Sequence, residues 1–312
     1  MFNDGHMSSN RLRRDADTPG DGDLALPPAG RSYPSRRPVP PTYDHGVPPA
    51  VPAVLAGLRV VDATRYAAPL REGGSLPGLV EADDDGMYVV KFRGAGQGVK
   101  ALVAEVVAGE LGRALGLPVP ELVLVEVAPG LGRAEPDQEI HDLVAASIGT
   151  NLGMDYLPGS MTFSPPADGA GARRPDPALA ADIVWFDGLV TNVDRSPHNP
   201  NLLTWHGRVH LIDHGAALYV HHSWRDPSAH ARRPFPQLRD HVLMPYAGPL
   251  TEADQRLSAL IDESLLRAVL SVVPESWLVD DTFAGPAQHR QAYVDYLMRR
   301  LEPPRPFLAG LT

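Results

Sequence analysis

The chain has 312 residues, enough for one large domain or two lobes, and its apolar (43%) and charged (21%) fractions are those of an ordinary globular protein. Its formal net charge of −10 argues against a nucleic-acid partner, because such proteins carry a basic face. The absence of cysteine excludes disulfides, thiolate metal sites and cysteine nucleophiles. Without an apolar run of membrane-spanning length or a signal-peptide pattern, we expect a cytoplasmic protein with no membrane partner.

The first 53 residues form the first predicted segment. They hold ten prolines and few bulky apolar side chains. Such a segment cannot bury enough apolar surface to offset its ordering entropy, so we predict a disordered tail over residues 1–53. A docking tail for a proline-reading partner is the alternative, and a spacer is the interpretation we favour.

A β-rich lobe with one main helix is predicted over residues 54–150. Residues 58–66 have the pattern of a strand, and "LVEADDDGMYVVKF" (79–92) has that of a hairpin turning at 84–86. The stretch 100–116 is strongly helical and ends at Gly116, and 120–127 alternates like another strand. The segment "NLGMDYLPGS" (151–160) is predicted to be a connector.

A mostly helical second lobe is predicted over residues 151–312. Leu179, Ile183, Phe186 and Val190 recur on one helix face. This helix leads into "NVDRSPHNPNLL" (192–203), which is followed by a hairpin with His206-Gly207 at its turn.

Two further helices complete the second lobe. One is predicted from Thr251 to Val273, opening with a capping-box-like Thr251-x-x-Asp254, and the other from Pro286 to Leu301. The fold class is therefore α+β with two lobes.

The two lysines of the chain differ in context. Lys91 and Lys100 are the only lysines among 28 basic residues, and arginine cannot replace a compact ammonium group on a flexible stem. For Lys100 we expect chance and genomic bias to be a sufficient explanation. Lys91, by contrast, alternates with Val90 and Phe92 on the second hairpin strand, so its side chain projects from one face of the sheet.

Glu105 is the predicted partner of Lys91. Its helical neighbours at three and four residues are small or apolar, so its face should be buried and the carboxylate needs a cation. Glu110, with Arg113 three residues on, has the pattern of a solvated pair. A strand lysine paired with a helix glutamate positions nucleotide phosphates in kinases, and a structural salt bridge is the alternative.

Three polar residues should meet at the open end of the second-lobe hairpin. Asn201 and Asp213 lie five and six residues from its turn on opposite strands, and Asp194 lies in the loop that feeds this end. Carboxylate and amide oxygens are the ligands that Mg²⁺ prefers. One of these three residues could be the base that orients a hydroxyl, and the other two could bind the metal.

These motifs carry a resemblance to a known family. "DRSPHNPNLL" followed by "HLIDHG" resembles the catalytic and metal-binding segments of protein-kinase-like folds, including the phosphatidylinositol kinases. "GELGRALGLPVPELVLV" is similar to the helix and strand after the phosphate-anchoring lysine in HipA proteins. From about Val60 to Leu301 the chain resembles the bacterial HipA-like kinase-domain family. The resemblance implies a two-lobed kinase-like fold that transfers the γ-phosphoryl group of ATP, with Mg²⁺, to a hydroxyl, in the first instance of a protein Ser/Thr.

The resemblance also implies residue roles. Lys91 would hold the α- and β-phosphates with Glu105 fixing it, Asp194 would accept the proton of the acceptor hydroxyl, and Asp213 would bind Mg²⁺, although His214 replaces the familiar phenylalanine. The metal-binding asparagine normally lies five residues after the acid, which selects Asn199. It also normally precedes an apolar strand directly, which selects Asn201. We favour Asn199 and keep both.

The phosphate-covering loop has two candidates. Gly73, Gly74 and Ser75 lie before the lysine strand, where kinases place this loop, and we prefer them. The alternative, 94–98, is richer in glycine but follows the lysine. Asp155, in the predicted connector, completes the cofactor-binding candidates.

Other functions stay open. The chain could be a catalytically inactive kinase-like scaffold that binds nucleotide, or a small-molecule or lipid kinase, and a regulatory protein partner is possible. A zinc-dependent hydrolase would need the histidines near the hairpin, which we expect to be ordinary surface residues. They are His206, His210, His214, His221 and His222.

Overall fold

The computed structural model describes residues 57–70, 76–133, 135–165 and 174–311, all within the compact unit Thr42–Thr312. The predicted tail (1–53) and the preferred phosphate-loop residues Gly73, Gly74 and Ser75 lie outside these ranges. Among the described helices, none combines the length and the apolar character needed to cross a membrane.

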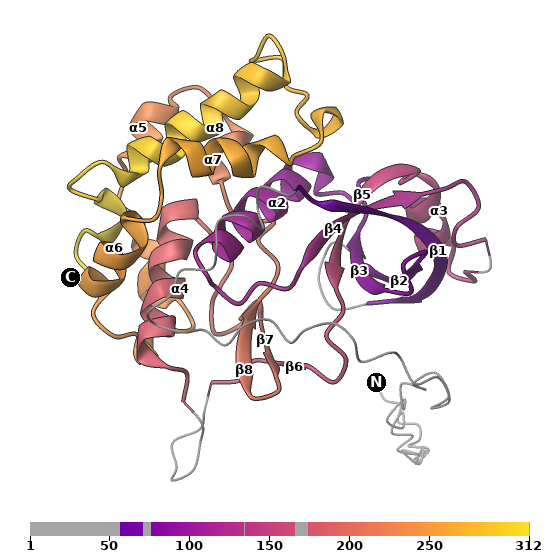
Figure 1. Cartoon of the computed structure of the whole chain (residues 1–312), viewed down its shortest axis with the longest axis horizontal. Helices are drawn as coiled ribbons and strands as arrows, with labels where there is room; N and C mark the ends of the chain where they lie inside the picture. The colour runs from indigo at the N-terminus through magenta and orange to yellow at the C-terminus, as the bar shows by residue number, and fades with distance from the viewer. Residues whose placement is uncertain (1–56, 71–75, 134, 166–173, 312) are drawn as a thin grey trace, which may run out of the picture. The chain divides into compact units, whose positions relative to one another are not determined.

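Five strands of the first lobe form a closed barrel (Figure 1). They are β1 (Arg59–Pro69), β2 (Gly78–Ala82), β3 (Met87–Lys91), β4 (Leu122–Val127) and β5 (Gly149–Asp155). Their order is β1-β2-β3-β5-β4, and the parallel pairing of β1 with β4 closes the barrel. Alternate side chains such as Val80, Val90 and Val125 fill its interior, as the period of two predicts.

The predicted β2–β3 hairpin is confirmed, but the predicted connector is wrong over its first five residues. Residues 151–155 belong to β5, which pairs with β3 on one side and β4 on the other. The segment lacks β-branched residues, so its strand depends on these two ladders rather than on local propensity. At Gly153 a Cβ would lie 2.6 Å from Val125 Cγ2, so a side chain there would collide with the neighbouring strand. The predicted lobe boundary, between 150 and 151, falls inside this strand.

Helix α2 (Gly98–Ala114) lies between the barrel and the C-terminal helices (Figure 1). Its residues 101–112 are all buried, and their apolar side chains share one core with the second lobe. A Cβ on Gly109 would meet Leu122 of β4, and one on Gly112 would lie 3.5 Å from Phe186 of the second lobe. The helix is therefore held from both sides. The expectation of a solvated Glu110 is wrong: Glu110 is buried while pairing with Arg113 at 3.2 Å.

The second lobe is built around α4 (Pro177–Val190), which is buried on all sides from Ala180 onward rather than on the single predicted face. A small sheet of β6 (Met161–Thr162), β7 (Leu202–Trp205) and β8 (Arg208–Leu211) lies beside it, and its β7–β8 hairpin is as predicted. Short helix α3 (Gln138–Ala145) belongs to the barrel lobe.

The C-terminal region contains α5 (Pro227–Ala231), α6 (Leu250–Ser258), α7 (Glu263–Ser271) and α8 (Pro286–Leu301). Short 3₁₀ turns precede, separate or follow these helices: η1 (Tyr219–His222), η2 (Pro236–Asp240), η3 (Met244–Tyr246), η4 (Glu275–Trp277) and η5 (Pro306–Leu308).

The single helix predicted from Thr251 to Val273 is wrong, because the chain breaks after α6 and restarts at α7. Asp262 caps α7 by accepting from the Leu265 N–H at 2.7 Å. The predicted capping box does not form: Asp254 instead accepts from Trp185 Nε1 at 2.8 Å. A tertiary contact has therefore replaced the local one.

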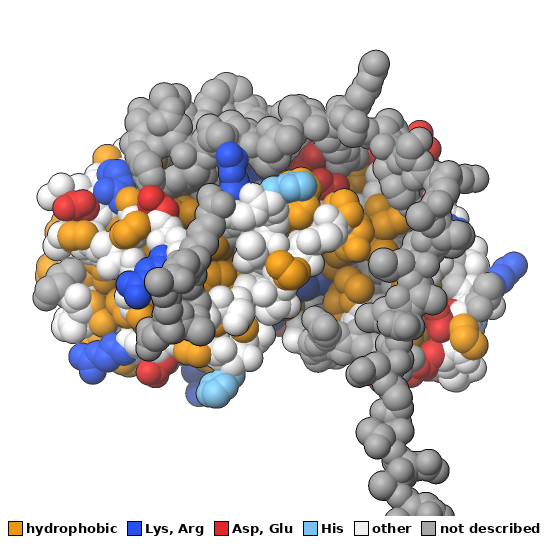
Figure 2. Space-filling model, turned by 90° about the horizontal axis from the view of Figure 1, so that it is seen from below, with side chains coloured by type: hydrophobic (Ala, Val, Ile, Leu, Met, Phe, Trp, Pro, Cys, Tyr) orange, Lys and Arg blue, Asp and Glu red, His pale blue; other side chains and the backbone are white. Residues whose placement is uncertain are grey.

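On the face drawn in Figure 2, described acidic and basic side chains are interspersed with hydrophobic ones.

Candidate active site

Lys91 and Glu105 form the predicted ion pair. Lys91 ends β3, and its Nζ donates to Oε1 of Glu105 on α2 and, at 2.6 Å, to Oδ1 of Asp213. The Lys91 side chain is 12% exposed and that of Glu105 5%. An ammonium group shared by two carboxylates therefore joins the barrel, α2 and the second lobe at one point.

The segment Asp213-His214-Gly215 closes against this pair. The His214 backbone N–H donates to Glu105 Oε2 at 2.8 Å, so both carboxylate oxygens of Glu105 are engaged. A Cβ on Gly215 would lie 3.2 Å from Glu105 Oε1, which favours glycine at this close approach. His214 is buried, with its ring edge against Phe186, and takes the position for which the resemblance expects phenylalanine.

Charge interactions shift the pKa values of all three partners. Burial alone would lower the pKa of Lys91, but Glu105 and Asp213 outweigh it and raise that pKa. Burial would raise the pKa of Glu105, yet Lys91 and His214 lower it. Burial and the nearby Glu105 carboxylate raise the pKa of Asp213 despite Lys91. Lys91 therefore stays protonated and Glu105 stays ionised. Two carboxylates share one ammonium group here, so a further cation beside Asp213 would reduce the excess of negative charge.

Asp194 lies at the centre of the loop between α4 and β7. Its Oδ2 accepts from Asn199 Nδ2 at 2.8 Å, and its backbone carbonyl accepts from Asn201 Nδ2 at 2.6 Å. Asn199 is exposed, whereas Asn201 is 9% exposed. The Ile212 N–H donates to the Asn201 carbonyl at 3.1 Å, so Asn201 lies beside Asp213 at the open end of the hairpin, as predicted.

A buried ion pair that sequence reasoning did not identify supports this loop. Arg195 and Asp187 are fully buried, and Arg195 Nε donates to Asp187 Oδ2 at 2.6 Å. Arg195 also donates to the carbonyls of Asn201 and Ile212, tying the loop to both hairpin strands. Burial alone would raise the pKa of Asp187, but Arg195 and His241 outweigh it and lower that pKa.

Two further groups converge on Asp187. Asn192 Nδ2 donates to Oδ1 at 3.1 Å, and His241 Nε2 lies 2.9 Å from Oδ2. His241 Nδ1 accepts from the Leu243 N–H, so its Nε2 carries the proton and donates to Asp187. The only local sequence feature that pointed to this ion pair was an acidic residue eight positions before Arg195. Nothing in that spacing indicates His241, which is 54 residues away from Asp187.

Three of the five N–H groups of the loop 94–98 are not free to bind phosphates, because they donate within the chain. The N–H groups of Gly94, Ala95 and Gly98 donate to Ser147 Oγ, the Phe92 carbonyl and the Ala95 carbonyl, respectively. These bonds instead fix the link between β3 and α2.

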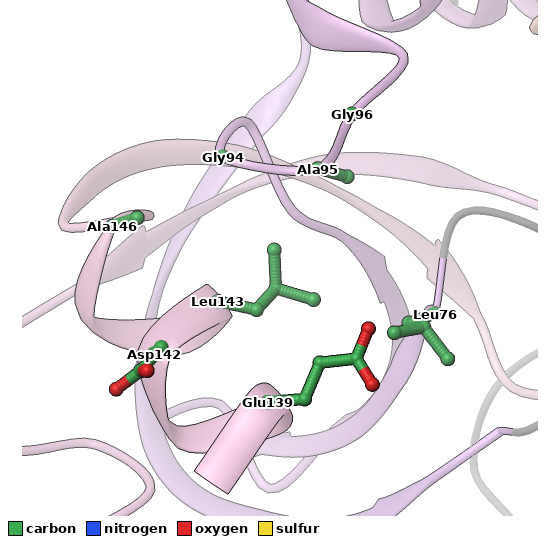
Figure 3. Close-up of a pocket in the computed structure, with 8 residues that line it drawn as sticks. All are labelled: Leu76, Gly94, Ala95, Gly96, Glu139, Asp142, Leu143 and Ala146. Carbon is green, nitrogen blue, oxygen red and sulfur yellow. The ribbon is translucent and has the colours of Figure 1, made fainter.

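A pocket of about 370 Å³ lies beside this loop and contains acidic side chains (Figure 3). Glu139 and Leu143 project from α3 toward Leu76, whereas Asp142 points away. Among the residues that the structure describes, no lysine or arginine lines this pocket. Carboxylates without a cation are unfavourable for phosphate, so we do not assign nucleotide phosphates here.

The remaining predicted residues are placed as follows. Asp155 ends β5 opposite Tyr88, three positions from the pairing of Lys91 with Leu152, and its N–H donates to the Glu121 carbonyl at 2.8 Å. Within the described ranges, no group of three or more His, Asp or Glu side chains could hold a metal ion. The histidines near the hairpin therefore give no support to a zinc site. The expectation of ordinary surface histidines is wrong for three of the five, since His210, His214 and His221 are buried. The Nδ1 of His221 lies 3.1 Å from the Tyr293 hydroxyl.

Comparisons with known proteins bear on the family and the fold of the chain. A model of the HipA-like kinase family matches residues 65–305. The crystal structure of a Helicobacter pylori proinflammatory kinase, CtkA, is similar with a TM-score of 0.50 and 14% identity, over 77% of this chain and 94% of that chain. The crystal structure of the Golgi casein kinase with Mn/ADP bound has a TM-score of 0.47 and 12% identity, over 84% of this chain and 76% of that chain. A search of curated proteins gave no match. The predicted two-lobed kinase-like fold is confirmed by the first structural likeness.

Proposed function

Since the chain belongs to the HipA-like kinase family, we propose that it transfers the γ-phosphoryl group of ATP to the hydroxyl of a protein Ser or Thr, with Mg²⁺. One observation carries this proposal. A continuous set of contacts runs from Lys91 through Asp213 and Ile212 to Asn201 and Asp194. These contacts support the proposal because they would hold a phosphate anchor, a metal-binding carboxylate and a base in one site.

Each residue has a distinct task in this proposal. Lys91, kept protonated by its two carboxylates, binds phosphate oxygens, and Glu105 holds its position. Asp194 accepts the proton of the acceptor hydroxyl as that oxygen attacks the γ-phosphorus and the bond to the ADP oxygen breaks. The Asn199 and Asn201 amides hold the Asp194 carboxylate and backbone in place.

The donor set fits a hard divalent cation. The side-chain oxygens of Asp213 and Asn201 are the ligand type that Mg²⁺ takes, and the Asn201 amide nitrogen is already committed to the Asp194 carbonyl. The amide oxygen of Asn201 therefore points away from that bond. When bound, the cation would neutralise charge on the phosphates. Both oxygens of the buried Glu105 carboxylate already accept hydrogen bonds, so we assign Glu105 to holding Lys91 rather than to the cation.

Asp155 pairs with Tyr88, whose side chain fills the barrel interior, whereas Lys91 projects from the other face of β3. Three residues along the β3–β5 ladder separate the two positions, a distance of about 10 Å. We therefore leave Asp155 out of the proposed phosphate site.

Incubation of the full chain with γ-labelled ATP tests the proposal. Label should move to protein or to inorganic phosphate when Mg²⁺ is present, and EDTA should stop the transfer. Binding of ATP without any transfer, to this chain or to an added protein, would instead identify a nucleotide-binding scaffold. Transfer only to a small molecule or a lipid would contradict the Ser/Thr assignment.

Between the two asparagines we propose Asn201 as the metal ligand. Asn201→Ala should raise the Mg²⁺ concentration needed for half-maximal activity by about 10-fold or more, as expected for the loss of a metal-site partner. Asn199→Ala should change this concentration less, because Asn199 is exposed and contacts only the Asp194 carboxylate and its own turn. Mg²⁺ titrations of the two variants decide the matter. A metal requirement raised only in the Asn199 variant would reverse the assignment.

A further inference from the structure

The second lysine of the chain is also placed by specific contacts. Lys100 lies in the first turn of α2, and its Nζ donates to the His221 backbone carbonyl at 2.7 Å and to Asp280 Oδ2 at 3.0 Å. Its side chain is 34% exposed and that of Asp280 13%. Both partners belong to the second lobe, at sequence separations of 121 and 180 residues.

The partners of Lys100 are rigidly held. His221 is buried in η1, and its ring stands edge-on to Tyr293 of α8 with centroids 6.2 Å apart. The Asp280 carboxylate also accepts from the Thr282 N–H at 2.9 Å, which fixes its orientation. Lys100 thus ties the start of α2 to η1 and to the segment between η4 and α8.

One face of α2 is docked on the segment that follows Asp213. Lys100 meets His221, Ala101 lies against Gly215, and Glu105 accepts from the His214 N–H. Glu105 is the only one of these three that also contacts Lys91. A shift of the first turn of α2 would therefore move Glu105 relative to Lys91.

We propose that Lys100 is a positioning residue that holds α2, and through it Glu105, in the register that keeps Lys91 paired. This role rests on the proposed function of the Lys91 site. A cationic side chain suits this role because it can donate to a carbonyl and a carboxylate from different segments at once.

The test of this proposal uses the fact that the chain has only two lysines. In both Lys100→Met and Lys100→Arg, Lys91 is the only remaining lysine of the chain. The rate of acetylation of Lys91 in the folded protein, followed by peptide mass spectrometry with an N-hydroxysuccinimide ester, reports how well its amine is held. We expect Lys100→Met to raise this rate at least about fivefold over Lys100→Arg, which keeps a cation opposite Asp280.

Controls separate positioning from general loosening. Arg267→Met removes the exposed α7 pair with Glu263 and should leave Lys91 labelling at the wild-type rate. All variants are labelled well below their unfolding temperatures. Equal labelling in the folded Lys100→Met and Lys100→Arg proteins would overturn the proposal.

Kinetics give a second readout. If wild type turns over ATP, Lys100→Met should raise KM for ATP and Lys100→Arg should restore it toward wild type. An unchanged KM in Lys100→Met would contradict the role in catalysis. The labelling result is independent of turnover, so a chain that fails to transfer phosphate would defeat the proposed function without obscuring the behaviour of Lys100.

Discussion

Replacing Asp194 by asparagine should lower the rate of phosphoryl transfer by about 10²- to 10⁴-fold, the range typical for loss of a general base. Asparagine is nearly the same size and can still accept from Asn199 Nδ2 through its amide oxygen, so the loop should keep its shape. ATP affinity should change little, because Lys91 and Asp213 remain. Single-turnover assays with labelled ATP, together with equilibrium nucleotide binding, measure the two quantities separately.

Two further variants test whether the loss of activity is specific to the Asp194 carboxylate. Asp213→Asn should lose activity to a similar extent but also need more Mg²⁺, because it removes a proposed ligand rather than the base. Asp85→Asn, at the exposed β2–β3 turn with φ of 60°, should retain wild-type activity since asparagine tolerates this backbone region. Near-normal turnover in Asp194→Asn would show that this carboxylate is not the base.

Replacing Arg195 by methionine should destabilise the protein by about 3–5 kcal/mol, the usual result of removing one partner of a buried ion pair. The change would leave the fully buried Asp187 carboxylate with only Asn192 and His241, and it would leave the Asn201 and Ile212 carbonyls without their side-chain donor. Urea unfolding at neutral pH, followed by circular dichroism, measures the loss.

The destabilisation should depend on Asp187. In Arg195→Met/Asp187→Asn, the buried charge is absent, so the double variant should be less unstable than the two single variants added together. Arg232→Met breaks an exposed pair with Glu302 at 3.6 Å and should change the free energy of unfolding by less than about 0.5 kcal/mol. A comparably small loss in Arg195→Met would mean that the buried pair does not hold the loop.

Local sequence patterns determined the first half of the site. Alternation along β3 put Lys91 outside the barrel, and the apolar neighbours of Glu105 indicated a buried helix face that needs a cation. The turn at His206-Gly207 fixed which residues of the hairpin meet at its open end. Each inference used residues close in sequence, where strand and helix periods dictate direction.

Tertiary contacts decided the rest. Strand β5 exists because two ladders pair with it, and the helix predicted from Thr251 is broken where Asp262 caps a new one. The support of Asp194 depends on a buried carboxylate shared by Arg195 and His241.

Local sequence patterns also could not predict the environments of the two asparagines and of Lys100. Asn199 and Asn201 are two residues apart in one loop, yet of the two only Asn201 accepts from the N–H of Ile212, the residue before Asp213. Lys100 looked incidental in the sequence, but its partners lie more than a hundred residues away. The sequence by itself determined which chemical groups this protein carries and on which faces. Their partners were decided by the folded chain, because burial and long-range hydrogen bonds depend on what packs beside a residue and not on its neighbours in sequence.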